Sequence, residues 1–120
     1  MFDDRCSFAV NFEGNKKKYM TFQEFLTKAH DRSVSTEYLK RYFRETMHHN
    51  LAYDNLDEEN KDFVLDIILK HRAKLLTNEH SSSTDIEREY YRIWERRESL
   101  HLLENDLKNI KDILHSFQSE

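Results

Sequence analysis

The chain has 120 residues, a charged fraction of 35%, a hydrophobic fraction of 38% and a formal net charge of −4. A chain of this length has room for one modest hydrophobic core, which excludes a second independent domain. Its single glycine and its lack of proline exclude the turn-rich sandwiches, barrels and nucleotide-binding sheet folds. The composition therefore predicts a mainly all-α fold, built as one small helical bundle.

Cysteine usage and hydropathy indicate the compartment. The single cysteine, Cys6, cannot form an internal disulfide, so nothing points to an oxidising environment. No apolar run approaches the roughly 20 residues that a membrane-spanning helix needs, and the first residues lack the basic and then apolar order of a signal peptide. We therefore expect an intracellular protein, in the cytoplasm or nucleus, with no membrane partner.

Alternating apolar residues near the amino terminus predict a β-hairpin around Gly14. Residues 6–12 alternate before this glycine and residues 18–22 alternate after it, which is the period of strands. Residues 13–26 also resemble the second half of a calcium-binding EF-hand, with Glu24 in the place of its bidentate carboxylate. Lys17 and Lys18 stand where that loop needs a ligand and a glycine. We therefore expect no bound metal and no cofactor.

Two short helices are predicted after the hairpin. The first begins at a capping box formed by Thr21 and Glu24 and continues to about residue 30. Ser35 or Thr36 can cap the second, which we expect to end near Asn50.

A third helix follows Asp57 and continues to about residue 76 as the most apolar part of the chain. We expect it to form the centre of the core, with His71 as a buried and hydrogen-bonded core histidine. Residues 78–83 are polar and rich in serine, which predicts a linker. The predicted organisation is a hairpin and three-helix unit over residues 1–77, this linker, and a final helical segment over residues 84–118.

The final segment predicts one long amphipathic helix. Thr84 and Glu87 form another capping box, and nothing breaks the helical pattern before Phe117. At 1.5 Å per residue such a helix is roughly 50 Å long, so we expect part of it to protrude or to meet another chain.

Apolar residues in this segment repeat with the heptad period of a coiled coil. One heptad position holds Ile86, Ile93, Leu100, Leu107 and Leu114, and an aromatic patch with Tyr91 lies nearer the start. We therefore predict that the segment binds a partner protein, or a second copy in a homodimer. The predicted contact residues are Tyr90, Trp94, Arg97, Leu100, Leu103, Leu107, Ile110 and Leu114. The same pattern leaves open that this stripe packs on the earlier helices as core.

Basic residues concentrate between residues 16 and 44. The two short helices could therefore form a helix-turn-helix in which Lys40, Arg41 and Arg44 face a nucleic-acid backbone. The usual turn glycine is missing, however, and the whole chain is acidic. A small nucleic-acid-binding regulator that dimerises through the last helix is the alternative hypothesis.

The sequence contains no nucleophile motif, phosphate-binding loop or metal-ligand spacing. The adjacent His48 and His49 would point about 100° apart on a helix, which makes a poor chelate. We therefore predict a non-catalytic interaction module, such as an adaptor, inhibitor or assembly subunit.

Overall fold

The computed structural model describes residues 20–119 of the chain. Within these residues the chain forms six α-helices and one 3₁₀ helix, and its only β pairing is an isolated bridge between Ser81 and Ser119. The helices are α1 (Phe22–Ala29), α2 (Thr36–Thr46), η1 (Met47–His49), α3 (Leu51–Asp54), α4 (Glu58–Leu76), α5 (Ser83–Glu95) and α6 (Glu104–His115). The all-α prediction is confirmed for the described residues.

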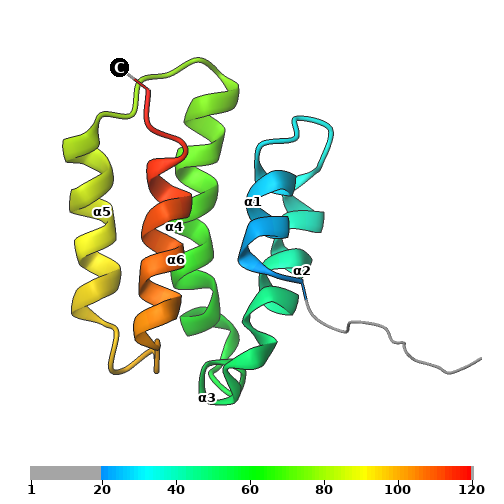
Figure 1. Ribbon diagram of the computed structural model, residues 1–120, viewed down its shortest axis with the longest axis vertical. Helices are drawn as coiled ribbons and strands as arrows, with labels where there is room; N and C mark the ends of the chain where they lie inside the picture. Colours follow the sequence, from blue (N-terminus) through cyan, green and yellow to red (C-terminus); the bar gives the residue numbers. More distant parts are fainter. Residues whose placement is uncertain (1–19, 120) are drawn as a thin grey trace, which may run out of the picture.

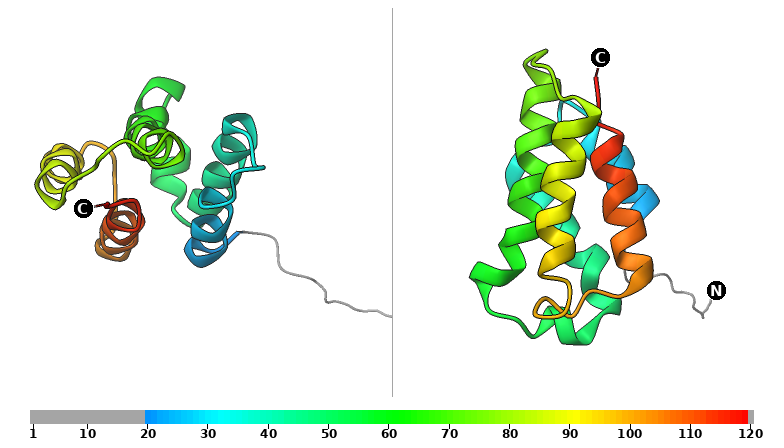
Figure 2. Two further views of the ribbon diagram at one scale, coloured as in Figure 1. Left: turned by 90° about the horizontal axis from the view of Figure 1, so that it is seen from above. Right: turned by 90° about the vertical axis from the view of Figure 1, so that its left-hand side faces the viewer.

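The long helix α4 lies between two helical hairpins (Figure 1). α1 and α2 form the hairpin on one side, α5 and α6 form the hairpin on the other, and α3 lies at one end of the bundle. α4 contacts α2 and α6 directly. The view along the bundle in Figure 2 shows the same order, with α6 between α5 and the α1–α2 hairpin.

One hydrophobic cluster contains buried residues from every α-helix. Its largest fully buried side chains are Tyr53, Phe25, Phe43, Phe117, Leu39, Met47, Leu65, Ile68, Ile86, Ile93, Leu100 and Ile110. Burial of this apolar surface is the main stabilising contribution to the fold. In residues 20–119 no helix is both long enough and apolar enough to cross a membrane.

Local capping explains where the early helices begin. The Oγ1 atom of Thr21 accepts the Glu24 N–H at 3.1 Å, and the Glu24 carboxylate accepts the Thr21 N–H at 2.9 Å. The side chains of Ser35 and Asp57 cap α2 and α4 in the same way. The predicted starts of these three helices are confirmed. The second helical segment ends at His49, next to its predicted end at Asn50, although its last three residues form the 3₁₀ helix η1, and the short helix α3 follows.

The predicted hairpin falls almost entirely outside the described residues, as does Cys6. Of its residues, Met20 packs against the core and Phe22 begins α1. Phe22 is therefore helical and not part of a strand.

The prediction of one long helix over residues 84–118 is wrong. Residues 96–103 reverse the chain, so α5 and α6 run antiparallel (Figure 1). His101 has a φ of 56°, and the Leu102 N–H donates to the Arg97 carbonyl at 2.9 Å. This is the Schellman ending of a helix, with histidine in the left-handed position that glycine usually occupies. The cap of α5 is Ser82, whose side chain accepts the Asp85 N–H, and not Thr84.

Because the chain reverses, residues of the heptad stripe are buried in the hydrophobic core. Leu100, Ile110 and Leu114 are fully buried, and Leu107 is nearly so. The expectation of an exposed coiled-coil seam is therefore wrong, and the alternative of an intramolecular core is correct for these four residues. Leu103, by contrast, remains 52% exposed.

The predicted linker over residues 78–83 joins α4 to α5, and both helices contribute to the same core. Asn78 has a φ of 60°, and the Glu79 N–H donates to the Lys74 carbonyl at 2.7 Å, which closes α4 with a second Schellman ending. Ser81 is buried, and its carbonyl accepts the Ser119 N–H at 2.9 Å.

His71 is a fully buried core histidine, as predicted. Its Nδ1 atom lies 3.3 Å from the Ser81 hydroxyl, and its Nε2 atom has no hydrogen-bond partner within the described residues. Burial lowers the pKa of His71, Lys74 lowers it further, and Glu89 opposes the shift. The neutral imidazole is therefore the form that the fold accommodates.

We predict that His101→Gly raises the free energy of unfolding by about 0.5–1 kcal/mol, because glycine removes the Cβ strain of the left-handed position. Denaturant unfolding measures this change. Ser99→Gly, in the same turn without positive φ, should lower the free energy of unfolding by a similar amount. A destabilising effect of His101→Gly would contradict the turn, because glycine within a continuous helix costs about 1 kcal/mol.

A second prediction concerns pH. Because the folded-state pKa of His71 lies below its ordinary value of 6.5, the unfolded chain binds the proton first on acidification. The free energy of unfolding should therefore fall as the pH drops below about 6.5, and the loss should be complete below the folded-state pKa. His71→Leu should reduce this pH dependence in urea unfolding between about pH 7.5 and pH 5, whereas the exposed-site variant His80→Leu should retain it. Equal slopes in wild type and His71→Leu would exclude this role.

Candidate functional site

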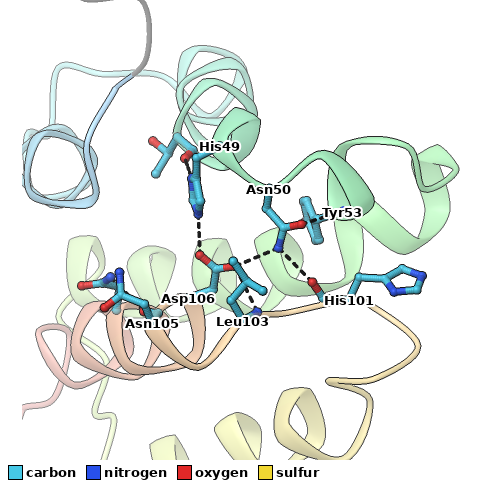
Figure 3. Close-up of polar contacts among 9 residues, drawn as sticks. His49, Asn50, Tyr53, His101, Leu103, Asn105 and Asp106 are labelled. Carbon is cyan, nitrogen blue, oxygen red and sulfur yellow. Dashed lines mark hydrogen bonds and ion pairs between the residues drawn. The ribbon is translucent and has the colours of Figure 1, made fainter.

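The α5–α6 turn meets η1 and α3 at one end of the bundle, where Asp106 joins them (Figure 3). Asp106 is fully buried, and its carboxylate has three hydrogen-bond partners. The His49 Nε2 lies 2.6 Å from Oδ1, while the Asn50 Nδ2 and the Leu103 N–H donate to Oδ2 at 2.8 and 3.1 Å. A buried carboxylate without donors would cost several kcal/mol, so these bonds are necessary for its burial.

Asn50 uses both ends of its side-chain amide at this corner. Its Nδ2 also donates to the His101 carbonyl at 2.8 Å, and its Oδ1 accepts the Tyr53 N–H at 3.1 Å (Figure 3). One side chain therefore caps α3, holds the left-handed turn residue and contacts the carboxylate of Asp106. The α5–α6 turn is fixed against α3 by this network.

Both ring nitrogens of His49 face oxygen atoms. Its Nδ1 lies 2.8 Å from the Thr46 carbonyl, while its Nε2 faces Asp106. The neighbouring His48 instead contacts Asp54 at 3.1 Å. His49 therefore has no free nitrogen to act as a general base or ligand. The His49–Asp106 pair links η1 to α6. Residues 20–119 contain no group of three or more His, Cys, Asp or Glu side chains that could hold a metal ion.

A groove of about 530 Å³ lies beside this network, between the start of α3 and the α5–α6 turn. Its lining comprises Asn50, Ala52, Trp94, Arg97, Glu98, His101, Leu102, Leu103, Glu104 and Leu107. Trp94 is 39% exposed and Leu103 is 52% exposed. Two large apolar side chains are therefore exposed along one groove whose backbone the Asp106 network holds in place.

Trp94 belongs to a stacked column on the outer face of α5. The Tyr91 and Trp94 rings stack with centroids 5.7 Å apart. Three residues after Trp94, the Arg97 guanidinium lies 3.7 Å from the Trp94 ring centroid and donates to the Trp94 carbonyl at 2.8 Å. Such contacts restrict the rotamers of all three side chains, so less conformational entropy is lost when a ligand contacts Trp94.

No protein-family model, curated protein or solved structure matches this chain.

The structure places the predicted contact residues in three environments. Trp94, Arg97 and Leu103 line the groove together, with the nearly buried Leu107 beneath them. Tyr90 is half-buried with the Lys111 ammonium 5.4 Å from its ring centroid, and burial raises the pKa of its phenol. The remaining three are core residues: Leu100, Ile110 and Leu114.

Sequence reasoning missed the residues that shape the groove. Asn50 and Asp106 are separated by more than fifty positions in the chain, and no periodicity links them. His49 was considered only as half of a poor chelating pair, whereas its ring contacts Asp106 on α6. The adjacent apolar residues Leu102 and Leu103 gave no signal of the turn, because adjacent apolar residues such as Ile67 and Ile68 are buried together within α4.

The basic residues of α2 line a separate hollow of about 930 Å³. Lys40, Arg41 and Arg44 share it with four carboxylates, those of Glu37, Glu45, Glu58 and Asp62. Arg44 forms ion pairs with Glu58 at 2.5 Å and Asp62 at 2.9 Å, and its hydrogen bond to Asp62 is the main cause that raises its pKa. These carboxylates would repel an approaching phosphate.

We predict that Asn50→Ala lowers the free energy of unfolding by about 2–4 kcal/mol, because it removes the α3 cap and leaves buried polar groups unpaired. Denaturant unfolding followed by circular dichroism measures the loss. Asn105→Ala provides the control, because Asn105 is exposed on the same first turn of α6 and should change stability by less than about 0.5 kcal/mol. Equal effects of both variants would show that the network contributes little.

Proposed function

We propose that this chain is a non-catalytic protein-interaction module, acting as an adaptor, inhibitor or assembly subunit. It binds a partner protein through the groove beside Trp94 and Leu103. The observation that carries the proposal is the exposure of these two apolar side chains along one groove, beside the Asp106 hydrogen-bond network. Tryptophan and arginine, both present here, are enriched among the residues that dominate interface energies.

The nucleic-acid alternative has weaker support from the same surfaces. Its predicted residues Lys40, Arg41 and Arg44 face four carboxylates in one hollow, and the chain as a whole has a net charge of −4. Affinity for a phosphate backbone depends on uncompensated positive charge. We therefore favour a protein partner over nucleic acid.

A test is selection from a random peptide library on the immobilised full-length chain. Selected peptides should lose binding by at least about tenfold on Leu103→Asp, because the variant places a charge in the apolar contact. The fold should survive this change, since Leu103 occupies the N-cap of α6 without a side-chain cap, and aspartate is a preferred N-cap residue.

Tyr38→Asp is the matched control, because Tyr38 is 51% exposed on α2, outside the groove. Peptides that bind through the groove should tolerate it. Failure to select any peptide, or selection only of peptides that Leu103→Asp leaves unaffected, would overturn the proposed function.

A further inference from the structure

Two carboxylates line the same groove as the apolar residues. Glu98 in the α5–α6 turn and Glu104 at the start of α6 are both exposed. Neither forms an ion pair with another described residue. Elsewhere on α5, Asp85 and Glu89 are paired with Arg88 and Arg92 at 3.1 and 3.0 Å. The groove therefore presents two unpaired carboxylates beside Trp94 and Leu103.

The arginine of the groove forms no ion pair with these carboxylates, so the groove holds two carboxylates against one guanidinium. The Arg97 guanidinium lies 3.7 Å from the Trp94 ring centroid and donates to the Trp94 carbonyl. Its contacts hold it against α5 and leave Glu98 and Glu104 without a cationic partner. A ligand that supplies cations at these positions gains two favourable charge contacts without breaking an existing ion pair.

We propose that the groove binds a segment of a partner protein in which one or two apolar side chains are flanked by lysine or arginine. This inference deepens the proposed function and rests on it. The apolar side chains contact Trp94 and Leu103, while the flanking cations contact Glu98 and Glu104. The volume of about 530 Å³ is in the range of sites that take a few side chains and not a whole domain face.

Charge also distinguishes this partner from a second copy of the chain. In a two-fold dimer the same patch meets itself. A second copy would bring two carboxylates and one arginine to a surface that already holds two carboxylates and one arginine, which is less favourable than a basic segment. An acidic segment is less favourable for the same reason.

Trp94 makes the inference directly measurable, because it is the only tryptophan in the chain and it lines the groove. We would titrate the full-length chain with three synthetic peptides that lack aromatic residues and share one pair of leucines. These leucines are flanked by lysines, by serines or by glutamates. The lysine-flanked peptide should change Trp94 emission with a Kd about tenfold lower than the serine-flanked peptide, and the glutamate-flanked peptide should bind most weakly.

The charge preference should depend on the groove carboxylates. The double variant Glu98→Gln with Glu104→Gln should abolish the difference between the lysine- and serine-flanked peptides, and high salt should reduce it in the wild type. The double variant Glu37→Gln with Glu45→Gln makes the same change in net charge on the α2 surface and should preserve the difference.

Other outcomes separate this inference from the proposed function. Equal binding of all three peptides, lost on Leu103→Asp, would overturn the charge selection and support an interaction groove. A lysine-flanked peptide that binds Leu103→Asp as well as wild type would contradict both. No emission change with any peptide up to about millimolar concentration, a range that includes weak contacts, would overturn the inference, and the peptide selection would then decide the function. Self-association in light scattering that Leu103→Asp abolishes would identify a second copy as the occupant.

Discussion

The buried carboxylate of Asp106 is the constraint on which the arrangement of the α5–α6 turn against η1 and α3 depends. A fully buried charge is tolerated only where donors surround it, and here the donors come from His49, Asn50 and the Leu103 N–H. These donors belong to η1, to the cap of α3 and to the start of α6. His49 and Asn50 are adjacent in the chain, and Leu103 is the N-cap of the helix that contains Asp106, so satisfying one carboxylate requires two distant segments to meet in one arrangement. The groove exists because the α5–α6 turn is held at that position.

At the other end of the bundle from α3, a buried cation holds the turn between α1 and α2 against α4 (Figure 1). Arg72 on α4 is 5% exposed and donates to the carbonyls of Ala29, Asp31 and Val34 at 2.7–2.8 Å. The first of these carbonyls belongs to the last residue of α1, and the other two belong to the turn before α2. The same central helix therefore anchors the α1–α2 hairpin by hydrogen bonds and packs against α6 through apolar side chains. With both hairpins fixed, the exposed apolar side chains at the α5–α6 turn are presented on a defined surface.

Local patterns predicted the early helices well. The Thr21–Glu24 capping box, the Ser35 cap and the Asp57 cap involve residues three apart, and each interaction forms within one helical turn. The same approach failed after residue 83. The apolar period continued through the α5–α6 turn without glycine or proline, so the periodicity could not reveal where the chain reverses.

The sequence by itself determined the helical class, the starts of α1, α2 and α4, and the identity of the apolar stripe, because these depend on neighbours within one or two turns. The tertiary structure decided that this stripe is buried within the chain and that the predicted final helix is divided into α5 and α6. A left-handed histidine is strained in isolation, and contacts far along the chain hold it: the His101 carbonyl accepts a hydrogen bond from Asn50, which also binds Asp106. The exposed Trp94 and Leu103 follow from that long-range contact, which no local pattern encodes.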